Sequence, residues 1–123
     1  MSVRKRLLAG LLLASAVLSA GSFSVGSTAA AQQPMVSVAM VDDPLPQDQW
    51  GYDPSTATVP VGGWVVWSNA GSEVHTVTAD DLSFDSGDKN PSEGFSFQFQ
   101  TPGTYTYYCI EHPWMKGTVV VTQ

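Results

Sequence analysis

Three residues near the C-terminal end of the sequence have side chains that bind soft metal ions. Cys109, His112 and Met115 bring a thiol, an imidazole and a thioether within seven consecutive residues. With a second imidazole, this is the ligand set that proteins use for copper cycling between Cu(I) and Cu(II), the thioether being a weak axial ligand. His75 is the only other histidine, so it is the candidate for the second imidazole. The residue types and spacing predict one redox-active copper site.

Cys109 is the only cysteine of the sequence, so an internal disulfide is excluded. A buried inert thiol and an intermolecular disulfide are the other interpretations of a lone cysteine. The neighbouring His112 and Met115 favour a metal ligand over both. His75 taken alone fits a buried core histidine better than a ligand. The copper prediction therefore depends on the four residues together.

The first 31 residues have the features of a secretory signal peptide. Cationic residues 4–6 precede an apolar run at 7–18, and residues 29–31 are three alanines of the kind found at cleavage sites. The apolar run is too short for a membrane-spanning helix, which needs about 20 residues. We expect export to the periplasm or another extracytoplasmic space, cleavage after Ala31 and a mature domain of residues 32–123 without a membrane span. An uncleaved N-terminal anchor is the alternative.

The charge of the expected mature domain limits its partners. Residues 32–123 contain all eleven acidic residues but only two strong bases, Lys89 and Lys116, and hence have a net charge of −9. Such a surface disfavours nucleic acid and anionic membranes as partners and is compatible with a cationic protein. Acidic residues that could steer such a protein are Asp42, Asp43, Asp80, Asp81, Asp85 and Asp88.

Short alternating apolar segments separated by Gly, Pro, Asn and Asp predict an all-β sandwich. The segments expected as strands are 35–41, 57–59, 64–69, 74–79, 95–99, 105–109 and 117–122. We expect residues 42–54 to form a loop, and the mostly polar segment 80–94 to contain a short helix or an irregular strand. Since alternate residues of a strand share a face, Cys109 should point inward with Tyr105 and Tyr107, and His75 with Val77. The same alternation directs Phe95, Phe97 and Phe99 into the core.

Over residues 34–123 the sequence resembles the type 1 blue-copper proteins, or cupredoxins, of the plastocyanin and amicyanin group. The similar segments are 52–54, 66–69, 99–109 and 116–121. The spacing of Cys109, His112 and Met115, with Pro113 after the histidine, matches the short ligand loop of amicyanin. The resemblance implies a Greek-key β-sandwich of about seven to eight strands.

For the site, the resemblance implies that His75, Cys109 and His112 are equatorial copper ligands and that Met115 is the axial ligand. It implies a monomeric one-electron carrier between a donor and an acceptor redox protein, such as a c-type cytochrome or a dehydrogenase. It also implies electron exit through the imidazole of His112. The apolar surface there would contain Pro113 and Trp114 with Pro44, Leu45 or Trp50. Tyr108 would offer a second route.

Three residues depart from the family pattern near the ligands. Thr76 stands where the family usually has an asparagine that joins the two ligand segments, and Val74 replaces a proline. Glu111 adds a negative charge between Cys109 and His112, which would favour Cu(II) if it were partly buried.

Three other functional classes are less consistent with the sequence. A copper store or chaperone usually has exposed Met- and His-rich tracts, and the chain has none. A multicopper oxidase or nitrite reductase needs further histidine sites, which two histidines cannot supply, so we do not expect an enzyme. A metal-free binding module would lack the full ligand set. The copper electron carrier is therefore the leading prediction.

Overall fold

The computed structural model describes residues 19–22 and 32–123, and the folded domain lies in the second range. Most of the predicted signal peptide falls outside the described residues. Within the described ranges, no helix is long and apolar enough to cross a membrane.

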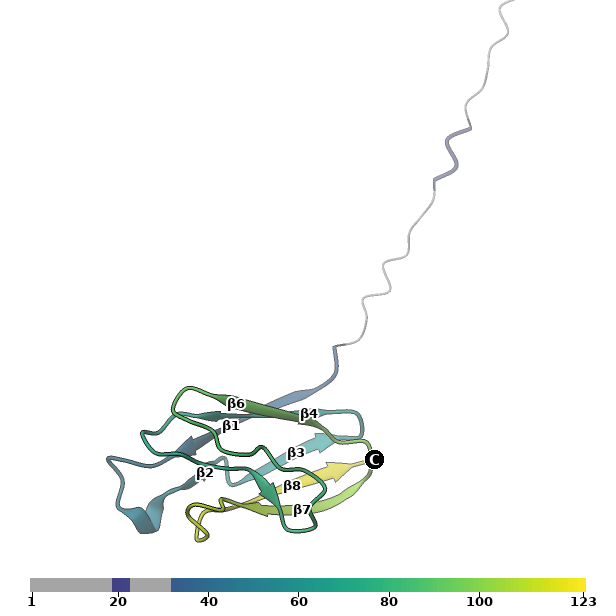
Figure 1. The fold of residues 1–123 in the computed structure, drawn as a ribbon. Helices are drawn as coiled ribbons and strands as arrows, with labels where there is room; N and C mark the ends of the chain where they lie inside the picture. The colour runs from purple at the N-terminus through teal and green to yellow at the C-terminus, as the bar shows by residue number, and fades with distance from the viewer. Residues whose placement is uncertain (1–18, 23–31) are drawn as a thin grey trace, which may run out of the picture. The chain divides into compact units, whose positions relative to one another are not determined.

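Residues 32–123 form eight strands and one short 3-10 helix, η1 (Gln47–Gln49). The strands are β1 (Met35–Val41), β2 (Gly51–Asp53), β3 (Thr56–Pro60), β4 (Trp64–Asn69), β5 (Thr78–Ala79), β6 (Gly94–Gln98), β7 (Gly103–Tyr108) and β8 (Lys116–Thr122). They make two four-stranded sheets, ordered β2-β1-β4-β6 and β3-β8-β7-β5, which Figure 1 shows as two facing layers. The predicted all-β Greek-key sandwich is confirmed.

Strands β7 and β8 form the hairpin that carries the candidate ligand loop. They pair antiparallel from Gly103 opposite Val121 to Tyr108 opposite Lys116. The residues between the last pair, 109–115, include Cys109, His112 and Met115. The pairing therefore fixes both ends of this loop at one end of the sandwich, where β7 ends and β8 begins.

The core between the sheets is rich in aromatic rings centred on Trp67, which has no exposed surface. Its indole stacks on Phe84 and Phe95 at centroid distances of 5.8 and 5.7 Å and meets Tyr107 edge-on at 5.5 Å. Phe84 belongs to the segment 80–94, which is mostly polar in sequence. Because Phe84 is only 4 % exposed, this segment contributes one ring to the core while its other residues mostly face solvent.

Two regions differ from the prediction by more than one or two residues at a strand end. The expected loop 42–54 contains η1 and β2, because Tyr52 faces the core and residues 51–53 pair with the end of β1. The expected strand 74–79 is regular only at Thr78–Ala79. Before it, the backbone N–H groups of Thr76 and Val77 donate to side chains, Cys109 Sγ and Ser86 Oγ, in place of a neighbouring strand.

Candidate metal centre

His75, Cys109 and His112 come together although His75 lies 34 residues before the cysteine. One donor atom from each residue lies within 4.8 Å of the other two. Cys109 Sγ is 3.8 Å from His75 Nδ1 and 3.7 Å from His112 Nδ1, so both imidazoles present the same nitrogen to the sulfur. His75 and Cys109 are fully buried, and His112 is half-buried. The structure thus brings together the three predicted equatorial residues.

Met115 is fully buried and is fixed by the backbone of the same loop. Its N–H donates to the carbonyl of His112 at 2.9 Å, and its carbonyl accepts from the N–H of Cys109 at 3.1 Å. These two bonds close the loop on itself. The predicted axial residue is therefore held next to both other ligands of the hairpin.

Thr76 performs the joining role that the family gives to asparagine. Its backbone N–H donates to Cys109 Sγ at 3.3 Å, and its Oγ1 accepts from the N–H of Ile110 at 2.9 Å. Oγ1 also lies 2.9 Å from Thr78 Oγ1. A threonine thus links the His75 segment to the Cys109 segment.

Asp42 lies behind His75, and our expectation that it could steer a partner from the surface was wrong. The residue as a whole is only 2 % exposed, and one of its carboxylate oxygens, Oδ2, lies 2.8 Å from His75 Nε2. The N–H groups of Ser72 and Glu73 donate to the same carboxylate at 2.8 to 3.0 Å. The alternation of β1 contained the signal: Val38, Met40 and Asp42 occupy successive positions on one face, and all three are buried.

The surroundings favour a thiolate at Cys109. Burial alone would raise the pKa of this thiol, but hydrogen bonds from His75, the N–H of Thr76 and His112 lower it to about 7. Burial would lower the pKa of His75, yet Cys109 and Asp42 raise it. Because the thiolate is the form that binds metal, the protein environment prepares this ligand.

Indole rings surround the half-buried His112. Trp50 meets it edge-on at 5.1 Å and Trp114 at 5.3 Å. The Trp114 Nε1–H donates to the carbonyl of Gln47 at 2.6 Å, so η1 is tied to the ligand loop. Trp114 and Leu45 are 47 % and 39 % exposed, as the predicted apolar surface requires, whereas Trp50 is buried at 7 %. Trp50 thus packs against the two histidines inside the site and does not belong to the exposed apolar surface.

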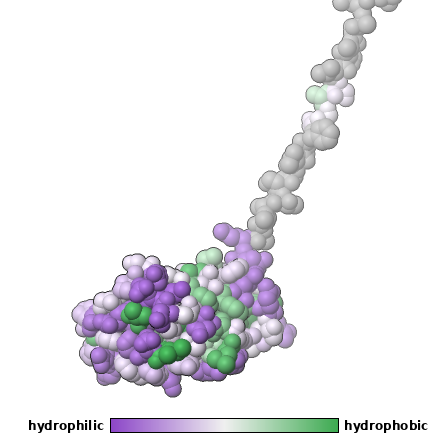
Figure 2. All heavy atoms as spheres, in the orientation of Figure 1, coloured by the Kyte–Doolittle hydropathy of each residue, from purple (hydrophilic) through white to green (hydrophobic). Residues whose placement is uncertain are grey.

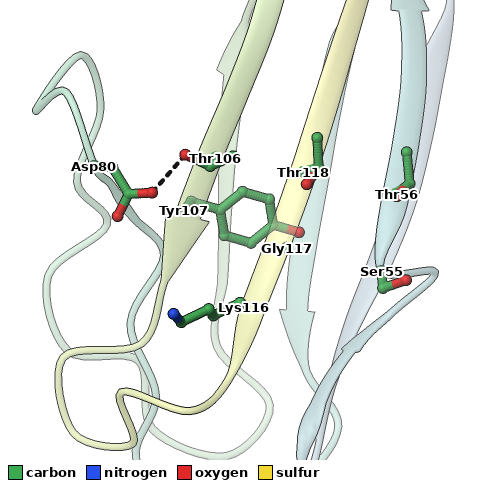
Figure 3. Close-up of a pocket in the computed structure, with 8 residues that line it drawn as sticks. All are labelled: Ser55, Thr56, Asp80, Thr106, Tyr107, Lys116, Gly117 and Thr118. Carbon is green, nitrogen blue, oxygen red and sulfur yellow. Dashed lines mark hydrogen bonds between the residues drawn. The ribbon is translucent and has the colours of Figure 1, made fainter.

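A separate cavity of about 450 Å³ lies beside the β7–β8 pair and contains none of the four candidate ligands. Figure 3 shows its lining residues, with Thr106 bonded to Asp80 and the ring of Tyr107 lying across Gly117. A Cβ at position 117 would overlap that ring, which explains the glycine directly after Lys116. This cavity is not part of the metal centre.

The donor set of the site fits copper. A thiolate, two imidazoles and a nearby thioether form the trigonal arrangement with a weak axial ligand that is diagnostic of type 1 sites. His75, Cys109, His112 and Met115 are arranged as such a site.

Comparisons with known proteins agree with this arrangement. Amicyanin-alpha of Methylorubrum extorquens is 31% identical over 118 residues, which cover 88% of this chain and 87% of the relative. Amicyanin of Paracoccus denitrificans is 28% identical over 120 residues, covering 89% and 92%. Among solved structures, a purple cupredoxin from Nitrosopumilus maritimus superposes with a TM-score of 0.63 and 29% identity, over 71% of this chain and 99% of that one.

The family model of the cupredoxin-like domain matches residues 9–121, nearly the whole sequence. The ligand arrangement, the two-sheet fold and these relatives lead to one assignment: the chain belongs to the cupredoxin-like domain family and is homologous to plastocyanin and amicyanin.

Proposed function

We propose that this protein is an exported one-electron carrier that binds one copper ion through His75, Cys109, His112 and Met115. The observation that carries the proposal is the group of three donor atoms, from two buried residues and the half-buried His112, each within 4.8 Å of the others. Copper bound there would supply a one-electron Cu(I)/Cu(II) couple.

The protein's own residues would keep the barrier to electron transfer low. Cys109 provides a thiolate, and the N–H of Thr76 holds its sulfur in place. The β7–β8 pairing and the bonds within the loop restrict movement of Cys109, His112 and Met115. A ligand set that moves little between two oxidation states costs little reorganisation.

Electrons would enter or leave near His112, since it is the most exposed of the three equatorial ligands. The exposed Trp114 beside it would contact a donor or acceptor redox protein, such as a c-type cytochrome or a dehydrogenase. We propose that the carrier works as a monomer in the periplasm or another extracytoplasmic space, after cleavage of residues 1–31.

A carrier is favoured over an enzyme. A copper-containing nitrite reductase from Thermus scotoductus resembles the chain at 25% identity and a TM-score of 0.59, but over only 22% of its own length. The likeness is therefore confined to one part of that enzyme. The two histidines of the chain are both used in the proposed site.

The test is to add Cu(II) to the purified residues 32–123 and to record visible and paramagnetic resonance spectra. We expect one copper per chain, an intense thiolate-to-copper band and reversible one-electron cycling. Cys109→Ser should abolish the band, because a hydroxyl cannot replace the thiolate donor. An unchanged band in this variant would refute the ligand assignment. Copper binding without reversible cycling would instead indicate a copper store.

A further inference from the structure

A buried carboxylate contacts the side of His75 that faces away from Cys109. His75 Nδ1 is directed toward the sulfur at 3.8 Å, while Nε2 lies 2.8 Å from Asp42 Oδ2. Both side chains of this pair have no solvent exposure. The imidazole therefore lies between the thiol of Cys109 and the carboxylate of Asp42. Asp42 precedes His75 by 33 residues and does not belong to the ligand group.

The loop after β4 holds this carboxylate in position. The N–H groups of Ser72 and Glu73 and the hydroxyl of Ser72 all lie within hydrogen-bonding distance of the two Asp42 oxygens. Gly71 passes so close that a Cβ there would overlap the carboxylate group. Asp42 thus cannot turn away from His75 without breaking several bonds.

We propose that Asp42 is a positioning residue that orients His75 and tunes the site toward the oxidised metal. By accepting the Nε2–H, the carboxylate selects the tautomer in which Nδ1 is free to bind the metal, and it raises the donor strength of that nitrogen. Its negative charge favours Cu(II) over Cu(I) in a buried site, where solvent screens it weakly. The tuning part rests on the proposed function, whereas the choice of tautomer concerns the protein without metal.

Asp42 could instead serve only to hold the loop 70–73. A purely structural role would change stability but leave both the His75 tautomer and the metal preference unaltered. The two roles therefore predict different results for the reduction potential and for the ring nitrogen signals.

The experiment compares Asp42→Asn with Asp43→Asn, which removes the same charge from the adjacent, exposed side chain. Reduction potentials of the copper-loaded proteins are measured by voltammetry. We expect Asp42→Asn to raise the ratio of Cu(I) to Cu(II) affinity about tenfold or more, equivalent to about 59 mV for one electron. Asp43→Asn should leave the potential close to that of the wild type. Equal potentials for the two variants would overturn the tuning role.

A second variant retains the charge. Gly71→Ala should displace the Asp42 carboxylate and shift the reduction potential in the same direction as Asp42→Asn. This variant tests the proposal if Asp42→Asn does not fold. An unchanged potential in a folded Gly71→Ala protein whose carboxylate has moved would also contradict the proposal.

The copper-free protein provides a readout that does not depend on electron transfer. Nitrogen-15 NMR of the neutral His75 ring should show the proton on Nε2 in the wild type and in Asp43→Asn, and a mixture of tautomers in Asp42→Asn. The same tautomer in all three proteins would refute the positioning role. If the wild type showed this tautomer but no reversible copper couple, the proposed function would fail while the role of Asp42 in orienting His75 would stand.

Discussion

At the scale of single residues, three of the four candidate ligands are held by contacts to other protein groups. Nε2 of His75 meets a carboxylate, Sγ of Cys109 receives a backbone N–H, and the backbone of Met115 bonds to the other ligands of its loop. Such supporting contacts reduce the freedom of the donors before a metal binds. We therefore expect a change in the ligand itself to alter the metal's electronic properties more than the fold.

Met115→Leu tests this expectation at the axial position. Leucine has nearly the same volume, so the fold should be retained at a cost below about 1.5 kcal/mol. The thiolate band should persist, and the reduction potential should rise because the thioether no longer donates to Cu(II). Voltammetry and visible spectra check both. The control is Met40→Leu, a fully buried methionine of β1. A potential unchanged in Met115→Leu would remove Met115 from the ligand set.

At the scale of elements, the site depends on the junction between two segments. The β7–β8 hairpin supplies three candidate ligands, and the irregular stretch before β5 supplies the fourth. Thr76 joins them through its N–H and its hydroxyl. Because Val77 bonds to Ser86 and His75 pairs with Lys89, the segment 80–94 supports the same stretch from its other side. The irregular backbone thus frees N–H groups for the site.

Thr76→Val should loosen this junction. Valine has a similar shape but leaves the N–H of Ile110 without its acceptor, so the free energy of unfolding should fall by about 1–3 kcal/mol. Copper should also pass faster to a chelator. Urea unfolding of the copper-free protein and the chelator rate measure the two effects. Thr104→Val, at an exposed position of β7, is the matched control. If the two variants behave alike, the Thr76 hydroxyl does not join the segments.

At the scale of the whole molecule, charge and apolar surface offer two means of docking. Figure 2 shows a face that is largely hydrophilic, interrupted by separate apolar patches. Of the six acidic residues predicted to steer a partner, Asp42 is buried and bonded to His75, whereas the other five are exposed. Long-range attraction would therefore come from the exposed carboxylates, and short-range contact from Trp114 near His112.

We expect the reaction with a basic redox protein to slow as ionic strength rises, because charges are screened beyond about 8 Å at physiological salt. Asp80→Asn with Asp81→Asn should flatten this dependence in stopped-flow measurements. Asp53→Asn with Glu93→Gln removes the same charge from exposed positions outside the six predicted residues and should flatten it less. Rates that do not depend on salt would exclude steering and leave the Trp114 surface as the main contact.

Features that depend on local spacing could be predicted from the residues alone. Alternation located β1 and β4 with their observed bounds, because one face of each strand must be apolar. The spacing of Cys109, His112 and Met115 identified a ligand loop, since the three residues lie in one hairpin turn. It also identified His75 as their partner, because no other histidine outside the loop was available.

The distant groups that support those ligands could not be predicted in this way, because they meet only in the folded chain. The expected strand 74–79 is irregular before Thr78 because the N–H groups of Thr76 and Val77 bond to Cys109 and Ser86. Phe84 enters the core from a segment that is otherwise mostly polar. The position of Asp42 followed the alternation of β1, but its bond to His75 depended on the path of the loop through Gly71. Periodicity tells which face a side chain occupies. Which partner it meets there depends on how the two sheets pack, and that is a property of the whole chain.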